Sequence, residues 1–463
     1  MKNYVARLVC FDDYPDAFVP EMWAHESLAI LEENQVMASL VHRDFSNEVQ
    51  NFGDVVNTRR PGEFYATRKS ADDDIVTQAP TATNVAVPLD QHIYQSFIIK
   101  DSDNSKSFLD LTDMYLAPNA QKIAQQIDRI LLARTVDFMA NISGNLNGLT
   151  AINAKANLLA TRNKMNQNLC PVMGRNIVYT PDSETAMLGT DMFVAANTRG
   201  DGGTALENAV LGRVLGFQHF MDQNTCGWDK TSTDYASGTV TGAKVAGSTA
   251  ANTVVITGYE VIPGEYAYIV GEDRVQRVSA ATASTDTTSV TFEDAFVNGC
   301  EAGAVIQVMK NYDVNGTYAA GYQKYIKVDG WTTSPSVGQI ITIGSYDYMI
   351  IEAVADADAP TTVTRITLDR PLAAIVTDED PVFPLPYGNY NLAFTRNAIA
   401  FVNRPLALPR QSTGVDAAFA DYNNLSIRIT MQYSAIKQGT ITTMDMLAGV
   451  KTLDVNQGCV LLG

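Results

Sequence analysis

The chain has 463 residues, of which 46% are hydrophobic and 18% charged, and its net charge is −18. This composition is that of a globular protein and excludes a disordered chain. An acidic field repels phosphate, so it excludes nucleic-acid binding through the overall charge of the protein. No stretch approaches the roughly 20 apolar residues of a spanning helix, and the N-terminus lacks the apolar core of a signal peptide. We expect a soluble protein made in a cytoplasm.

The first predicted helix lies within residues 19–45. Pro20 suits a first helical turn, and Trp23, Ile30 and Met37 recur at intervals of seven. Apolar residues occur on both faces, which indicates a helix held by more than one partner. A helix packed only within its own subunit is the alternative that periodicity leaves open.

Residues 51–91 predict a strand, a turn at Pro61–Gly62, a second strand, a polar tip and a third strand. Few of these residues can fill a core, so we expect a long β-hairpin that projects. The hairpin either pairs with a neighbouring subunit, where charges would fix the register of the contact, or is a solvated loop. Its charged residues are a basic arm, Arg59, Arg60, Arg68 and Lys69, and an acidic tip, Asp72, Asp73 and Asp74.

The clearest helical pattern covers residues 118–140, with isoleucines and leucines at three- and four-residue steps. Its other stripe carries Lys122, Arg129, Arg134 and Asp137, which predicts a surface helix laid along a sheet or domain. Residues 145–225 mix helix and strand, and Pro181 to Glu184 are typical of the first turn of a helix that follows a strand.

Composition changes at about Trp228, and from there to about Pro386 short alternating runs predict an all-β insertion. A weak internal repeat lies inside it, with one copy starting at Pro263 and the other at Ser336. The repeat indicates two similar small β-units side by side, although small barrels in general share this pattern. Strands return after Pro386.

No motif indicates catalysis. The four histidines lie in no metal-binding spacing, no GxSxG nucleophile elbow is present, and Lys244 in a Gly-rich run is followed by Val245 rather than Ser or Thr. Acidic runs at 356–358 and 378–380 lack the glycine and terminal glutamate of a calcium loop, so we expect solvated turns. We therefore predict no enzyme, no cofactor and no metal.

The five cysteines are far apart, without a CxxC. Reduced and buried thiols are the expected state in a cytoplasmic chain. The alternative is that Cys10 or Cys459 crosslinks neighbouring subunits after release into an oxidising medium.

The order of these parts resembles the major capsid protein of tailed bacteriophages with the Hong Kong 97 fold, and within it the coat-protein branch of the short-tailed Salmonella phages, which carries an inserted β-domain. Four passages carry the likeness: "ESLAILEENQVMASLVHRDF" with "FGDVVNTRRPGEFYA"; "NVAVPLDQHIYQSFIIKDSD" leading into the helix at 118–140; "LENAVLGRVLGFQHFMDQNT"; and "FTRNAIAFVNRPLALP" with "SIRITMQYSAIKQGTITTMDMLAGVKTLDV".

The resemblance implies an α+β chain of six parts. These are an N-terminal arm (1–48), an extended loop (49–95), a peripheral domain with a spine helix (96–145), an axial domain (146–227), the β-insertion (228–385) and return strands (386–463). The insertion does not match the family residue by residue.

The resemblance also implies function. Copies would form hexamers and pentamers of an icosahedral head that encloses double-stranded DNA without specific binding. The implied partners are further copies, a scaffolding protein, a portal ring and a decoration protein, in a virion assembled in the bacterial cytoplasm, with no membrane. Arg396 and Arg404 become candidates for pairing between subunits, with Trp23 and the hairpin charges. The alternative is a β-rich virion adhesin or decoration protein that binds glycans through residues 228–385; a hydrolase is the third hypothesis.

Overall fold

The structure is a computed structural model, strand-rich and of mixed α+β class. It describes residues 24, 27–28, 35–43, 55–61, 66, 68–69, 74–75, 77, 82–101, 115–144, 149–194, 209, 211–225, 235–240, 242–243, 252–256, 260–269, 275–283, 288–293, 296, 299–321, 325–331, 335–356, 363–386, 388–404, 406–409, 415–422 and 425–463. The chain forms two compact units, which we describe separately. The first comprises Met1–Gln35, Arg43–Ile127 and Phe401–Gly449, and the second comprises Val36–His42, Asp128–Ala400 and Val450–Gly463.

The first unit is built on a five-stranded sheet in which β24 is central. The strand order is β21-β24-β23-β22, and β3 pairs with β24 over ten residues, from Gln91↔Ala448 to Lys100↔Gly439. Strands β21, β23 and β24 each contain at least three consecutive buried residues, so both faces of that part of the sheet are covered. The strands are β3 (Gln91–Lys100), β21 (Ile399–Arg404), β22 (Asp416–Tyr422), β23 (Leu425–Ser434) and β24 (Gly439–Thr452).

A separate two-stranded sheet lies in the same unit. Strand β1 (Val55–Pro61) pairs antiparallel with β2 (Ala82–Pro88), from Val55↔Pro88 to Pro61↔Ala82. The predicted turn at Pro61–Gly62 is described only in part, because Pro61 belongs to β1 and pairs with Ala82, whereas Gly62 lies outside the described residues. Proline has no amide hydrogen, and Pro61 ends β1. The described residues beyond it, Ala66, Arg68 and Lys69, lie outside any strand.

The predicted helix at 118–140 is present but differs in two respects. Helix α4 spans Ala117–Leu132 and tightens into the 3₁₀ helix η3 over Ala133–Phe138. Its first half is amphipathic, whereas from Ile127 onward most positions are buried, including Asp128 and Arg134. A surface helix with Arg134 on an exposed stripe is therefore wrong for the second half, because both sides of that half are covered.

The first predicted helix is described only in part. Ala24, Ser27 and Leu28 are helical and buried, at the three- and four-residue spacing of one helix face. Helix α2 spans Met37–Leu40. Trp23 lies outside the described residues.

The second unit is built on a six-stranded mixed sheet in the order β4-β25-β20-β5-β7-β6. Strand β5 runs parallel to β7 and antiparallel to β20, and β25 runs parallel to β4, from Val460↔Ile142. The strands are β4 (Ile142–Gly144), β5 (Arg175–Tyr179), β6 (Arg213–Val214), β7 (Phe217–Met221), β20 (Tyr390–Thr395) and β25 (Gly458–Leu462).

Three helices contribute to the core of this sheet. Leu158 of α5 (Ala154–Gln167), Met187 of α6 (Pro181–Leu188) and Phe193 of α7 (Asp191–Val194) belong to one cluster with side chains of β5, β20 and β25. Helix α6 begins as predicted, with Pro181 in the first turn, and the side chain of Thr180 accepts a hydrogen bond from the backbone N–H of Ser183.

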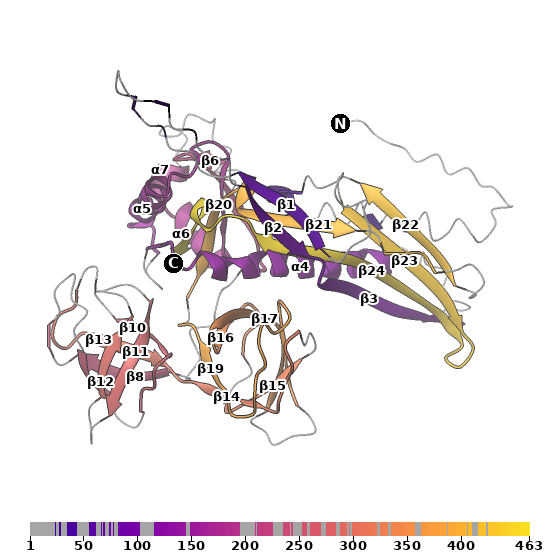
Figure 1. The fold of residues 1–463 in the computed structure, drawn as a ribbon. Helices are drawn as coiled ribbons and strands as arrows, with labels where there is room; N and C mark the ends of the chain where they lie inside the picture. The colour runs from indigo at the N-terminus through magenta and orange to yellow at the C-terminus, as the bar shows by residue number, and fades with distance from the viewer. Residues whose placement is uncertain are drawn as a thin grey trace. The chain divides into compact units, whose positions relative to one another are not determined.

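Two closed six-stranded barrels follow β7 in the chain, coloured pink and orange in Figure 1. The first comprises β8 (Tyr235–Val240), β9 (Asn252–Ile256), β10 (Tyr266–Ile269), β11 (Val275–Ala283), β12 (Thr288–Phe292) and β13 (Val305–Met309). The second comprises β14 (Tyr312–Asn315), β15 (Ile326–Asp329), β16 (Ile340–Ile343), β17 (Tyr346–Ala355), β18 (Thr364–Leu368) and β19 (Pro381–Pro384).

The two barrels have the same topology. Numbered within each barrel, the strands close in the order 1-2-5-4-3-6 in both. The passages from Pro263 and from Ser336 supply the third to fifth strands of their barrels. In each barrel the register between the fourth and fifth strands shifts once, after Val278 in the first barrel and after Ile350 in the second. The same backbone bonds recur there: Gly264 N–H to Val278 O and Val278 N–H to Glu265 O; Gly338 N–H to Ile350 O and Ile350 N–H to Gln339 O.

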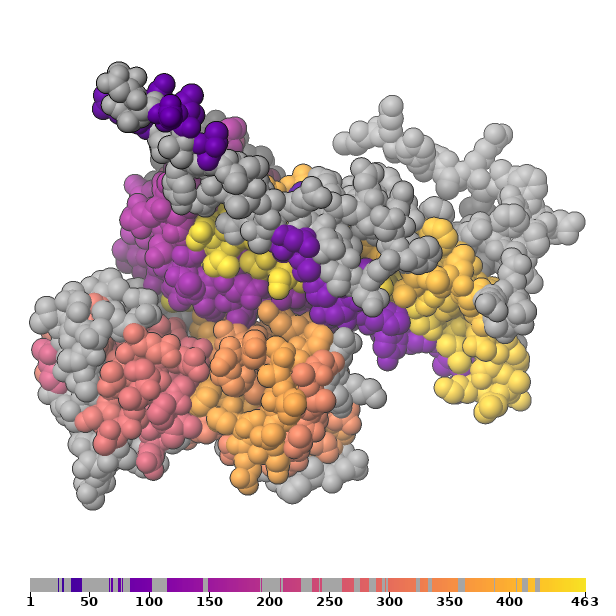
Figure 2. Space-filling view, viewed as in Figure 1, coloured from indigo at the N-terminus to yellow at the C-terminus, as the bar shows by residue number. Residues whose placement is uncertain are grey.

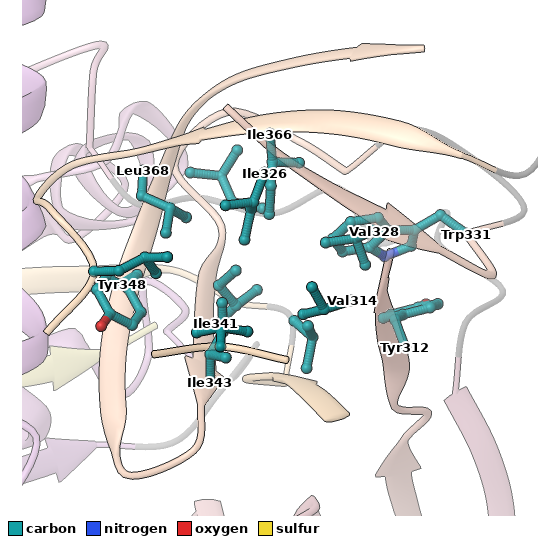
Figure 3. Close-up of a cluster of buried hydrophobic side chains, with 14 residues drawn as sticks. Tyr312, Val314, Ile326, Val328, Trp331, Ile341, Ile343, Tyr348, Ile366 and Leu368 are labelled. Atoms are coloured by element: carbon teal, nitrogen blue, oxygen red, sulfur yellow. The ribbon is translucent and has the colours of Figure 1, made fainter. Parts of the chain in front are cut away.

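Each barrel has its own hydrophobic core. In the second barrel the rings of Tyr312 and Trp331 lie 4.6 Å apart between centroids, at the opposite end of the cluster from Tyr348 and Leu368 (Figure 3). Its side chains gather into a rounded body, orange in the space-filling view of Figure 2. A separate core for each barrel indicates that each can fold as a unit.

Candidate assembly surfaces

The residues predicted to contact other subunits are widely spread. Arg59 and Arg60 occupy consecutive positions of β1, paired with Asn84 and Thr83 of β2. Arg68, Lys69 and Asp74 are exposed and lie outside strands. Asp72 and Asp73, like Trp23, lie outside the described residues. The structure thus places two of the four basic residues on the hairpin itself and two beyond the end of β1.

Arg396 and Arg404 flank strand β21. Arg396 is exposed in the 3₁₀ helix η4 (Arg396–Ala398), and Arg404 is half-buried at the end of β21. Both already interact within the chain. The segment that joins them is buried: Ile399, Phe401 and Val402 are at most 1% exposed.

Helix α2 is held by a carboxylate from the middle of α4. The N-cap residue of α2, Val36, provides no side-chain cap. Instead the Val36 N–H donates to Asp128 Oδ2 at 3.0 Å and the Met37 N–H donates to Asp128 Oδ1 at 3.1 Å. Beyond the helix, the His42 N–H donates to the Ile399 carbonyl at 3.0 Å. Residues 36–42 are therefore docked at both ends.

Asp128 belongs to a buried pair of carboxyl groups. Burial, and second the charge of Asp222, raise the pKa of Asp128 to about 8, although hydrogen bonds from the amides of Val36, Met37 and Ala38 lower it. Burial also raises the pKa of Asp222, which is opposed by hydrogen bonds from Asn224 and by the charge of Arg129. Near neutral pH the pair therefore holds a proton, and two adjacent buried negative charges are avoided.

Sequence reasoning missed Asp128, because it treated the acids of the helix as surface residues. Asp128 lies four residues after Ala124 and three before Leu131, which places it inside the apolar stripe. A lone carboxylate within such a stripe is the signal that was available.

A second buried charge pair ties the sheet of the first unit together. Arg428 of β23 lies opposite Asp445 of β24 and donates from Nε to Asp445 Oδ1 at 2.9 Å and from Nη2 to Oδ2. His92 Nε2 of β3 lies 3.5 Å from Asp445 Oδ2. Arg428 Nη1 also donates to the carbonyl of Ala407. One guanidinium thus links two strands and the 406–409 segment.

The acidic runs of the second barrel are used structurally. Asp356 is not on a solvated turn: its side chain is 2% exposed and receives Lys327 Nζ at 2.7 Å and Arg365 Nη2 at 2.9 Å. Asp378 accepts the Gly316 N–H and Asp380 the Thr377 N–H, so both stabilise turns. Across the part of the chain that the structure describes, no group of three or more His, Cys, Asp or Glu side chains could hold a metal ion.

Cys170, Cys300 and Cys459 are reduced and buried. A crosslink through Cys459 is wrong, because this residue is fully buried and burial raises its thiol pKa to about 11. Cys10 lies outside the described residues. Among the helices that the structure describes, none is long and apolar enough to cross a membrane.

Comparisons with known proteins give structural similarity only. No protein-family model and no curated protein matches the chain. A chain of Mycobacterium phage Che8 is similar with 12% identity and a TM-score of 0.43, over 92% of this chain and 90% of that one. The capsid structure of the cyanophage P-SCSP1u gives 11% identity and a TM-score of 0.41, over 91% and 85%. The capsid of Ralstonia phage GP4 gives 8% and 0.41, over 91% and 86%.

Proposed function

We propose that the chain is the major capsid protein of a tailed bacteriophage with the Hong Kong 97 fold. In this role copies form hexamers and pentamers that close into an icosahedral head around double-stranded DNA. The order of parts in the sequence supports the proposal: an arm, an extended loop, a long helix, a mixed axial domain with an inserted β-region, and strands that return at the end.

The observation that carries the proposal is the β1–β2 hairpin. Seven residue pairs join its two strands, and within the described chain neither strand pairs with a third. A two-stranded hairpin is at best marginally stable alone in water, so it gains stability by lying on another surface. In a closed shell, head-to-tail contacts around each ring provide that surface on a neighbouring copy.

The other partners follow from the same role. Assembly would involve a scaffolding protein and a portal ring in the host cytoplasm, and a decoration protein could bind the finished head. The net charge of −18 fits a container that holds DNA without gripping it. Tight binding of DNA by purified shells or subunits at low salt would contradict this part of the proposal.

Electron microscopy of the expressed protein tests the function directly. Closed shells or capsomer rings are the expected result. Discrete monomers or trimers that bind glycans would favour the adhesin, and turnover that is lost on mutation of one carboxylate would favour a hydrolase.

The hairpin itself is tested by charge reversal of Arg59, Arg60, Arg68 and Lys69 to Glu. The subunit should remain folded while shells fail to form. The matched control reverses four exposed lysines with the same change in net charge, Lys100, Lys122, Lys437 and Lys451. Normal shells from the hairpin variant would remove the pairing role of these residues.

A further inference from the structure

The loop between α5 and β5 exposes an unusual set of side chains. Leu169 is 90% exposed, Met173 79% and Val172 55%. Single exposed apolar residues are common on protein surfaces. Three within five residues of one short loop are a local concentration of exposed apolar side chains, and apolar patches on a surface mark sites of contact with other proteins.

Leu169 is also held in a strained backbone conformation. Its φ is +56°, in the left-handed region that residues other than Gly, Asn and Asp rarely enter. It follows Asn168, the C-cap residue of α5, and so occupies the position where helices commonly end with Gly or Asn. A leucine here destabilises the backbone and buries almost nothing within the subunit. Such strain at an exposed site indicates a role for the side chain outside the subunit.

A buried arginine fixes the shape of this loop. Arg175, 2% exposed, donates from Nε to the Pro171 carbonyl at 2.7 Å and from Nη2 to the Cys170 carbonyl at 2.7 Å. Cys170 points inward and is 5% exposed. The loop therefore presents its apolar side chains on a preformed backbone, which lowers the entropy lost when a partner binds.

The charge around the loop identifies the kind of partner. The chain has 51 Asp and Glu residues, yet none lies between residues 138 and 181. That stretch carries Lys155, Arg162 and Lys164 at partly or fully exposed positions, whereas its fourth basic residue, Arg175, is buried. A basic and apolar surface is complementary to an acidic one, and every other copy of this chain is acidic overall. Self-pairing of the same surface would oppose like charges, so the contact must be head-to-tail.

We infer that Leu169, Val172 and Met173, which we call the 169–173 knob, form a head-to-tail contact with the acidic surface of a second copy of this chain. The inference rests on the proposed function, because it names one of the contacts by which copies would assemble. It is independent of the hairpin, which lies in the other unit.

Leu169→Asn separates folding from assembly in one substitution. Asparagine tolerates the left-handed conformation better than leucine, so the free subunit should unfold at the same or a higher urea concentration than the wild type. Assembly, measured by light scattering against protein concentration, should require at least a tenfold higher concentration. Met173→Ser should act in the same direction, and Lys164→Glu should weaken assembly more at low than at high salt.

The matched control is Ile375→Asn, which removes an apolar side chain that is 67% exposed on a turn of the second barrel. It should leave the assembly concentration unchanged. If Leu169→Asn and Met173→Ser both assemble at the same protein concentration as the wild type, the knob contact is overturned and the proposed function still stands. A wild-type chain that stays monomeric under all conditions would overturn both.

Discussion

Asp128 accepts the backbone amide of Met37 across 91 positions of the chain, at 3.1 Å. A side chain from the middle of one helix thus caps the start of another that has no cap of its own. Since Asp128 lies beside Asp222 and its pKa is raised to about 8, the strength of this link depends on pH.

The free energy of unfolding should therefore be higher at pH 6 than at pH 8. The pKa of Asp128 is about 8 in the folded state against an ordinary 3.8, so between these two values the folded state binds more protons than the unfolded state. The free energy of unfolding then falls as pH rises from about 4 to about 8. Urea unfolding at the two pH values checks this sign.

Asp128→Asn tests the origin of this dependence. The amide keeps one acceptor and cannot ionise, so the variant should lose about 1 kcal/mol at pH 6 and less at pH 8, with a flatter pH profile. Asp182→Asn, at an exposed carboxyl, is the control and should keep the wild-type profile. A profile for Asp128→Asn as steep as that of the wild type would assign the pH dependence to other groups.

Arg428→Met should destabilise the first unit by about 3–5 kcal/mol, because it leaves the carboxylate of Asp445 buried without its charged partner. Asp445 is 4% exposed, so water cannot replace the lost bonds. The double variant Arg428→Met with Asp445→Leu should recover most of the loss. Urea unfolding checks both, with Lys437→Met as a surface control expected within about 0.5 kcal/mol. Additive losses in the double variant would contradict the pairing.

Gly458→Ala should destabilise the second unit by about 1–3 kcal/mol through overpacking. The Gly458 backbone is extended, with φ −133°, so alanine fits the backbone. A Cβ there would lie 2.3 Å from Cδ1 of Phe138, whose ring is fully buried. Phe138→Leu in the same chain should relieve the clash, so the double variant should be more stable than the sum of the single changes predicts.

The control for this cycle is Gly174→Ala. Gly174 has φ +73°, and no heavy atom lies within 4 Å of the position that an alanine Cβ would take there. The cost of this substitution, about 1 kcal/mol, therefore comes from the backbone alone. Phe138→Leu should not rescue it. Equal rescue of both glycine variants would show that the ring contact is not the cause.

Deletion of residues 226–386 should leave a folded sheet. Strand β7 ends beside β5, at Tyr179↔Met221, and β20 starts on the other side of β5, at Leu392↔Val178. The two ends are thus two strand spacings apart, about 10 Å, which a Gly/Ser linker of about six residues can span. Circular dichroism and urea unfolding check the result; an aggregated product would show that the sheet needs the barrels.

The same deletion removes Arg370, which donates to Asp137 Oδ1 at 3.3 Å from the second barrel. Asp137 keeps its bond from Thr452. In the full chain Asp137→Asn should therefore destabilise, whereas in the deletion protein it should have little effect. A loss confined to the full chain identifies the pair.

Local signals predicted local structure well. The strand-rich insertion, helix α6 and the closing strands follow from alternation and helix-start residues within a few positions of one another. The predicted turn at Pro61–Gly62 rested on a local signal alone. A Pro-Gly pair favours a turn, yet which strand pairs with β1 is decided by residues 82–88, some 20 positions away.

Non-local structure was beyond these signals. Strand β25 joins β4 through Val460↔Ile142, more than 300 residues apart, and no spacing rule relates them. The place of Asp128 in the apolar stripe could be seen in the sequence, but its partners could not, since they come from residues 36–37. The capsid hypothesis came from the order of parts in the sequence. The 169–173 knob was found from the exposed fractions of its side chains and the φ angle of Leu169, which only the structure provides.

The place of β25 in its sheet sets an order of events during synthesis. Strands β4, β5 and β20 cannot close around it until residue 462 has left the ribosome, after both barrels are complete at residue 384. At roughly 5–20 residues per second, the interval is about 4–16 s. Small all-β domains fold within about milliseconds to seconds. The barrels are therefore folded before the sheet that carries them is complete, and newly made chains meet one another with the insertion already folded.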